Sequence, residues 1–131
     1  MAINDQKVIQ ALQAHSEVQR GTLVYVYAFQ DDWAGLFAAL FIKFFYLAWD
    51  GSKFSLMQIS LGGKEKNFIS FDRQDIESVK IKNRIIDIKI RLILKDKSIY
   101  NLKCVKKVRG LTRQAEYLER ICSILQPYNT T

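Results

Sequence analysis

The sequence is poor in the residues that build redox, metal and nucleophile sites. Two cysteines and one histidine occur among its 131 residues. Cys104 and Cys122 stand outside any CxxC pair, so neither a redox motif nor a zinc site can be assembled from them. Free cysteine is usually buried, and we expect both to be small apolar filler. This scarcity predicts a protein without a cofactor that stays in a reducing cytoplasm.

Catalytic signatures are also missing. The sequence has no Gly-rich phosphate loop, no GxSxG nucleophile elbow and no HExxH zinc motif. His15, the single histidine, has no nucleophile motif beside it, which favours a surface role over that of a general base. Asp31 and Asp32 could bind a cation, but an adjacent acidic pair is more typical of a solvated turn. We therefore predict that the protein is not an enzyme.

No apolar run is long enough to span a bilayer. The most apolar stretch, Ala34 to Trp49, has 16 residues and contains Lys43, whereas a spanning helix needs about 20. Its second half is aromatic and strand-prone, so we expect it to be buried. The opening residues, MAINDQKVIQ, lack the basic start and apolar run of a signal peptide. These features predict a cytoplasmic protein.

The composition is that of one ordinary globular domain, with 49% hydrophobic and 25% charged residues. The two halves of the chain differ in charge. Residues 1–60 carry four Lys/Arg and five Asp/Glu, whereas residues 61–131 carry sixteen and eight. Eleven of the sixteen aromatic residues lie between Tyr25 and Phe54. The first half is therefore expected to supply core, and the second half to supply charged surface.

Local patterns predict a helix, about seven strands and a second helix. Asn4 or Asp5 can cap a helix over residues 4–14. Strand-like runs follow at 23–29, 41–49, 53–60, 67–71 and 76–82. Asp50-Gly51 between two of these runs is typical of a type I′ hairpin, which needs positive φ at both central residues. Gly62-Gly63 is expected to make the next turn.

The clearest pattern is IDIKIRLILK, from Ile86 to Lys95, which alternates with period 2. One face is expected to be core, with Ile86, Ile88, Ile90, Leu92 and Leu94. The other face is expected to meet water, with Asp87, Lys89, Arg91, Ile93 and Lys95. After a turn at Asp96-Lys97, residues 98–105 repeat the alternation. Together they predict an antiparallel meander.

A helical stripe closes the sequence. Its apolar positions recur at steps of four and three, and they are Leu111, Ala115, Leu118, Cys122 and Leu125, widened by Ile121 and Ile124. Thr112 is the expected N-cap, and Pro127 is expected to stop the helix. Because all the strands are consecutive, the sheet should be antiparallel, with its apolar face covered by this helix.

Four segments resemble short bacterial pleckstrin-homology-like (PH-like) domains: FYLAWDGSKFSLMQIS, FDRQDIESVKIKN, IDIKIRLILKDKSIYNLKC and KKVRGLTRQAEYLERICSIL. The family's Ile-x-x-Val pattern is matched by Asp75, Ile76, Ser78 and Val79. The resemblance covers about 21–125 and implies an α+β fold that is mainly β, a seven-stranded antiparallel partly open barrel over 21–105. A C-terminal helix over 111–126 would cap the barrel, and the helix over 4–14 would complete one domain over 1–131.

The resemblance also implies a difference in ligand binding. Phosphoinositide-binding PH domains carry several Lys/Arg in the loop that joins the first two strands. Here that loop contains Asp31, Asp32 and Trp33 and no basic residue before Lys43. Binding of an inositol phosphate at the usual site is therefore not expected.

Two surface candidates remain. The basic patch consists of Lys103, Lys106, Lys107, Arg109 and Arg113, which could create a local positive field or simply be solvated. The apolar loop consists of Trp33, Leu36, Phe37 and Leu40, which could insert into a bilayer interface, dock a partner or fold down as a lid on the barrel.

The leading functional hypothesis is a binding or scaffold module that engages a protein partner or its own copies through exposed strand edges and the acidic-aromatic loop that begins at Asp31. The alternative is peripheral association with anionic lipid at the inner face of the membrane, through the basic patch. Nucleic-acid binding is less favoured, since the aromatic residues that would stack on bases lie mostly in the other half of the chain. No small-molecule substrate is expected, because bulky side chains should fill the barrel interior.

Overall fold

The computed structural model describes residues 3–15, 18, 23–30 and 42–130. Its elements follow the predicted order of helix, seven strands and helix. The helices are α1 (Asp5–Gln13) and α2 (Gln114–Leu125), and the short 3-10 helices are η2 (Arg73–Asp75) and η3 (Gln126–Tyr128). The strands are β1 (Val24–Gln30), β2 (Lys43–Trp49), β3 (Phe54–Ile59), β4 (Glu65–Phe71), β5 (Ile76–Asn83), β6 (Asp87–Leu94) and β7 (Ile99–Val105).

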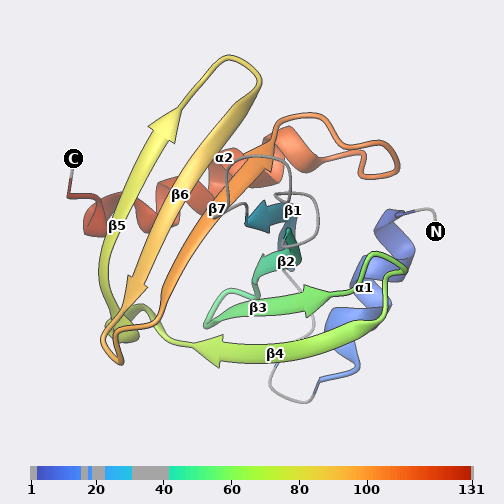
Figure 1. Cartoon of the computed structure of the whole chain (residues 1–131), viewed down its shortest axis with the longest axis horizontal. Coiled ribbons are helices and arrows are strands. Elements are labelled where there is room, and N and C mark those ends of the chain that lie inside the picture. Colours follow the sequence, from blue (N-terminus) through green and yellow to red (C-terminus); the bar gives the residue numbers. More distant parts are fainter. Residues whose placement is uncertain (1–2, 16–17, 19–22, 31–41, 131) are drawn as a thin grey trace.

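All seven strands belong to one antiparallel sheet in the order β4-β3-β2-β1-β7-β6-β5. The first half of the sheet, β1 to β4, runs across the second half, β5 to β7 (Figure 1). In the described part of the chain, the register between β1 and β7 has one pair, Phe29 with Lys103. The outer strands β4 and β5 are linked through η2 and are not neighbours in the sheet. The predicted partly open, helix-capped barrel is thus confirmed.

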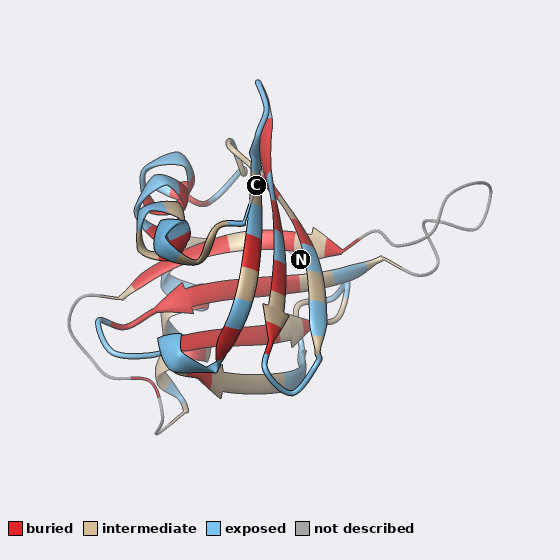
Figure 2. Cartoon of the chain, turned by 90° about the vertical axis from the view of Figure 1, so that its left-hand side faces the viewer, coloured by how far each residue is buried: buried red, intermediate tan, exposed pale blue. Residues whose placement is uncertain are grey.

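The first half of the sheet is buried on both faces along its central strands. In β1 five of seven residues are buried, and in β2 the last five are buried without a break (Figure 2). Burial on both faces agrees with the run at 23–29 being apolar at successive positions and not only at alternate ones. Aromatic contacts fill the interior, with ring centroids 4.6 Å apart for Trp49 and Phe54 and 5.5 Å apart for Phe54 and Phe71.

Helix α2 covers one end of the barrel with a stripe that only partly matches the predicted one. Leu118, Ile121 and Leu125 are buried as expected. Ala115 is exposed, and Tyr117 takes its place in the buried face. The helix gives way at Leu125 to η3, which contains Pro127 and so ends the α-helix where the sequence predicts.

The N-cap expected at Thr112 is wrong. The helix begins at Gln114 after an N-cap residue, Arg113, that forms no side-chain cap. Thr112 instead donates two hydrogen bonds to Asp5 Oδ2, from its backbone N at 3.1 Å and from its hydroxyl at 2.8 Å. The hydroxyl is therefore used to join two segments, and it is unavailable to the helix terminus.

Gln114, in the first turn of α2, forms hydrogen bonds to both halves of the sheet. Its buried side chain accepts a hydrogen bond from Tyr27 N at 3.0 Å. It donates two more, to Tyr27 O at 2.9 Å and to Val105 O at 3.0 Å. One amide thus satisfies backbone groups of both β1 and β7.

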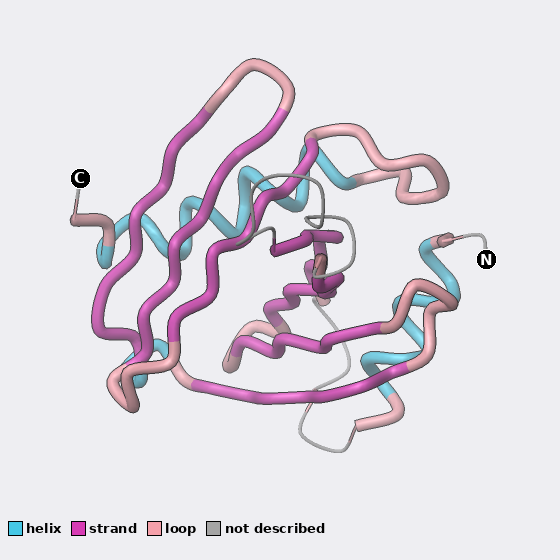
Figure 3. Tube along the Cα trace, viewed as in Figure 1, coloured by secondary structure: helices cyan, strands magenta, loops and turns pink. Residues whose placement is uncertain are grey.

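Helix α1 forms as predicted, with Asn4 as its N-cap accepting from Lys7 N at 2.9 Å. Its apolar edge is narrow, and Val8 and Leu12 are fully buried. Asp5 accepts a hydrogen bond from the Tyr25 hydroxyl at 2.6 Å, as well as the two from Thr112. The helix is therefore tied both to β1 and to the loop before α2, which reaches back towards it (Figure 3).

Gly110 makes the close approach in that loop possible. Its φ is +94°, and a Cβ added there would lie 1.7 Å from Ile3 O. Only glycine fits, since any side chain would collide with the N-terminal backbone.

The hairpin between β2 and β3 exists, but its turn type differs from the prediction. Trp49 pairs with Phe54 across a four-residue loop. Gly51 has a φ of 95°, and Asp50 does not have positive φ. The Asp50 carboxylate accepts from Ser52 N and Lys53 N at 2.8 and 2.7 Å, and this capping replaces the type I′ turn.

The alternation predicted for β6 holds from Ile88 to Leu94 and is wrong at its start. Asp87, expected in water, is fully buried, and Ile86, expected in the core, is 67% exposed. The strand begins at Asp87, so Ile86 belongs to the preceding turn. Asp87 is buried because two cations, described below, surround its carboxylate.

None of the helices in the described part of the chain is long and apolar enough to cross a membrane. Within the apolar stretch at 34–49, Lys43 to Trp49 form β2, as the burial hypothesis requires. Positions 34–41 lie outside the described residues.

Candidate binding surface

The second half of the sheet carries rows of cations across its outer face. Lys80 of β5 stands opposite Arg91 of β6. Lys82, Lys89 and Lys103 stand opposite one another across all three strands. Directly paired residues of an antiparallel sheet point to the same side. We call the surface formed by Lys80, Lys82, Lys89, Arg91 and Lys103 the basic face.

The basic face is electrostatically unfavourable for the folded chain on its own. Like charges placed directly opposite each other on a sheet are destabilising. Within the described part of the chain, no ion pair neutralises its four outermost cations, Lys80, Lys82, Lys89 and Arg91. The concentration of unneutralised charge therefore produces a positive field over β5 to β7.

One buried anion, Asp87, lies next to this surface at the start of β6. Asp87 Oδ1 lies 2.9 Å from Arg84 Nε, and its Oδ2 lies 3.8 Å from Lys103 Nζ. The same Oδ2 accepts a hydrogen bond from the other end of the Arg84 guanidinium at 3.3 Å. Lys103 also lies over the Phe29 ring, 5.5 Å from its centroid. The Asp87 carboxylate thus holds Arg84, just before β6, and Lys103, in β7.

The predicted basic patch is divided by the structure. Lys103 belongs to the basic face, and Lys106 follows it at the end of β7, where its backbone N donates to Ile86 O at 2.9 Å. Lys107 and Arg109 are exposed in the loop before α2. Arg113 is engaged with its own helix, 3.3 Å from Glu116 Oε1, 3.2 Å from the Tyr117 hydroxyl and over the Tyr117 ring. Lys107 and Arg109 are therefore the cations of this patch that are exposed and in no ion pair within the described residues.

The apolar loop of Trp33, Leu36, Phe37 and Leu40 lies outside the described residues. The other singled-out residues are placed. His15 stacks on Phe68, with 3.7 Å between ring centroids, and its Nε2 lies 2.6 Å from Glu65 Oε1. It thereby docks the segment after α1 onto β4.

Both cysteines are free, and their surroundings favour the protonated thiol. Burial, with the nearby Cys122 and Asp87, raises the pKa of the fully buried Cys104 well above its usual range. Burial, with a contribution from Glu119, raises the pKa of Cys122 to about 11. A thiol that stays protonated is a poor nucleophile, so both fit the predicted filler role.

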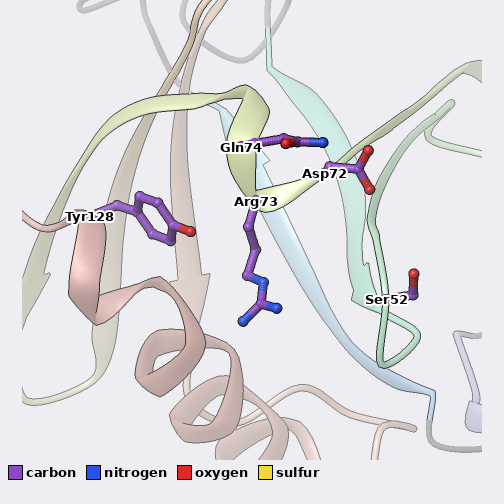
Figure 4. A pocket seen from close by; sticks show the side chains of 5 residues that line it. All are labelled: Ser52, Asp72, Arg73, Gln74 and Tyr128. Carbon is purple, nitrogen blue, oxygen red and sulfur yellow. The ribbon is translucent and has the colours of Figure 1, made fainter.

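A polar pocket of about 380 Å³ opens between the β2–β3 loop, η2 and the C-terminal turn (Figure 4). It is lined by Ser52, Asp72, Arg73, Gln74 and Tyr128. Arg73 leans over the Trp49 ring, 5.5 Å from its centroid. The Asp72 and Asp75 side chains cap the turn of η2. The lining offers one cation beside one carboxylate, which gives it little net preference for a charged ligand.

Comparison with solved structures supports the fold and extends no further. The hSac2 domain from human phosphoinositide phosphatase Sac2 superposes with a TM-score of 0.55 at 13% identity, over 97% of this chain and 84% of that chain. That domain is PH-like. The present chain has a PH-like fold. No protein-family model and no curated protein matches the sequence.

Sequence reasoning missed most of the basic face. It singled out the cations around the end of β7, but it treated those of β5 and β6 as ordinary solvated positions. Within one strand, alternating Lys and Arg are indeed typical of solvent exposure. Only the pairing of Lys82 with Lys89, and of Lys80 with Arg91, turns separate charges into a continuous surface.

Proposed function

We propose that the chain is a non-enzymatic PH-like binding module that associates peripherally with an anionic membrane through its basic face. The observation that carries this proposal is the placement of Lys82, Lys89 and Lys103 in one cross-strand row beside the pair of Lys80 and Arg91. Anionic headgroups would supply the negative charge that the described part of the chain does not place opposite these cations. Each Lys or Arg near such a surface contributes about 1 kcal/mol to binding.

The strand edges favour this reading over the protein-partner hypothesis that the sequence places first. The free edge of β5 is covered by the C-terminal segment, where Thr130 N donates to Val79 O at 2.9 Å and Asn129 forms a parallel bridge with Val79. Asn129 Oδ1 also accepts from Ile81 N at 3.4 Å. An incoming strand would have to displace these contacts, so β5 is a poor site for strand addition.

The proposal is tested by sedimentation with lipid vesicles of neutral phosphatidylcholine, with and without anionic phosphatidylserine. A variant that replaces Lys80, Lys82, Lys89 and Arg91 by Gln should bind the anionic vesicles at least about tenfold more weakly. Wild-type binding should fall as salt is raised, because these charges are exposed to screening.

The control carries the same loss of charge on the other half of the molecule. It replaces Lys7, Lys53, Lys64 and Lys66, all exposed, by Gln. Equal weakening by both variants would show a response to net charge alone, and binding that ignores lipid charge would contradict the proposal. Preferential binding to nucleic acid over anionic vesicles, in a competition with duplex DNA, would also contradict it.

Self-association remains a second candidate, favoured by the outer edge of β4. Among the described strands its one neighbour is β3, and it begins with three exposed residues, Glu65, Lys66 and Asn67. Such an edge can pair with a second copy. Light scattering coupled to size exclusion over a range of concentrations should then detect a dimer. A single monomeric mass throughout would contradict this candidate.

A further inference from the structure

The turn between β5 and β6 presents two adjacent isoleucines to solvent. Ile85 is 93% exposed and Ile86 is 67% exposed. Leu61, at 84%, and Ile99, at 46%, are the other large apolar side chains exposed in the described part of the chain, and each stands alone. Single exposed apolar side chains are normal, but an adjacent pair at a projecting tip is a feature of contact surfaces. We call residues 84–87 the tip.

The tip projects beyond the rest of the sheet in two perpendicular views (Figures 1 and 2). Its backbone is closed by Arg84 N donating to Asp87 O at 2.8 Å, and it is braced from β7 by Lys106 N donating to Ile86 O at 2.9 Å. The Arg84 side chain is anchored on the buried Asp87 carboxylate, 2.9 Å away. The isoleucines are thus held outward by a hydrogen-bonded frame, and inward collapse would break it.

Cations surround this apolar point on both sides. Lys82 precedes it on β5, and Lys106 and Lys107 follow at the end of β7, which the tip contacts directly. The basic face continues below, through Lys89 and Lys103. An apolar point ringed by positive charge complements a bilayer that has anionic headgroups above an apolar interior.

We propose that the tip inserts Ile85 and Ile86 into the headgroup and acyl boundary of an anionic bilayer, while Lys82, Lys106 and Lys107 contact the headgroups. This inference rests on the proposed function and deepens it, since it fixes which end of the molecule enters the membrane. Stable peripheral binding commonly needs two signals, and here the apolar tip adds to the electrostatic one.

The experiment compares two double variants on the same phosphatidylcholine and phosphatidylserine vesicles. Ile85→Ser with Ile86→Ser should lower partitioning by about tenfold or more, because two apolar side chains no longer leave water. Leu61→Ser with Ile99→Ser removes exposed apolar side chains elsewhere and should leave partitioning unchanged. Thermal unfolding of both variants should match wild type, since surface substitutions away from packed features usually have small effects.

Insertion itself is read from tryptophan placed at the tip. Ile85→Trp should gain emission, above the wild-type background, that is shifted to the blue and quenched by brominated acyl chains. Leu61→Trp should show neither change. Two results would overturn insertion and leave the proposed function standing. One is that the Ile85→Ser, Ile86→Ser variant binds as strongly as wild type. The other is that brominated lipid does not quench the tryptophan at the tip. A wild type that fails to bind anionic vesicles would overturn both.

Discussion

The two halves of the sheet have the same antiparallel pairing but differ in what their side chains provide. Strands β1 to β3 are buried along most of their length and bring aromatic side chains into contact, as with Trp49 and Phe54. Strands β5 to β7 mix buried and exposed residues, and their exposed positions include Lys80, Lys82, Lys89 and Arg91. The first half therefore provides most of the packing, which lets the second half tolerate opposed like charges.

The two halves meet where β1 lies beside β7, and we call this junction the seam. Gln114, Gly110 and Asp5 all act near that seam or between it and α1. Substitutions at these positions should disturb the coupling between the halves, whereas neutralising substitutions on the basic face should leave that coupling intact. The comparison can be tested in that order.

Replacing Gln114 by Leu should have the largest effect. The substitution keeps the apolar volume of the site but leaves Tyr27 N, Tyr27 O and Val105 O without their hydrogen-bond partner. Buried backbone groups deprived of a partner cost about 1 to 3 kcal/mol each, so we expect unfolding free energy to fall by at least about 3 kcal/mol. Urea denaturation measures this loss. The same change at the exposed Gln10 should cost little stability. Comparable losses of stability at both sites would contradict the role of Gln114 in joining the two halves.

Replacing Gly110 by Ala should rank second. The residue combines a left-handed φ with a carbonyl oxygen, Ile3 O, in the space that a Cβ would occupy. We expect a loss of about 2 kcal/mol from strain and displacement of the N-terminal segment. Amide hydrogen exchange should show faster opening of α1. Gly62 is the matched control, because a Cβ there would lie 3.8 Å from its nearest neighbour, Ser60 Oγ, in ordinary contact.

Asp5 should confer a modest, acid-sensitive part of the stability. Burial alone would raise the pKa of its carboxyl, but hydrogen bonds from Tyr25 and Thr112, with the charge of Arg113, hold that pKa below the usual 3.8. A carboxyl with a depressed folded-state pKa stabilises the fold above its unfolded pKa, and the contribution is lost as pH falls through the folded value. Asp5→Asn should thus cost about 1 kcal/mol near neutrality.

Denaturation curves collected at several pH values test the sign of this effect. The difference between wild type and Asp5→Asn should shrink as pH drops below about 4. Parallel loss of stability in both proteins, with a constant difference, would exclude Asp5 as the source. Because α1 is tied to the loop before α2 through Asp5, the variant should also loosen that loop without altering the core strands.

The order of elements could be predicted from sequence because it depends on local periodicity. Alternation marked β6 and β7, and the spacing of Leu118, Ile121 and Leu125 marked α2. The failures all depend on partners distant in sequence. Asp87 is buried because Lys103 and Arg84 meet it, and Thr112 leaves its capping role because Asp5 binds it. The local sequence around each residue does not indicate either contact.

The basic face was unpredictable for a related reason. The register between β5 and β6 shifts between Ile76 and Ser78, so the parity that sets Lys80 opposite Arg91 depends on a bulge. A shift of one residue would have placed different side chains on the outer face. The exposed pair at the tip was hidden likewise, because Ile86 continues the alternating pattern of β6 in sequence but lies in the turn before the strand.

Replacing Lys89 by Gln should have the smallest effect and should separate stability from binding. Lys89 is the middle cation of its row, opposite Lys82 on one side and Lys103 on the other. Neutralising it removes two repulsions, so we expect stabilisation of up to about 0.5 kcal/mol at low salt that disappears at high salt. The same variant should bind anionic vesicles more weakly. Lys66→Gln, on the edge of the first half, should show neither change. If the stability of Lys89→Gln falls together with its vesicle binding, the row stabilises the fold instead of serving a ligand.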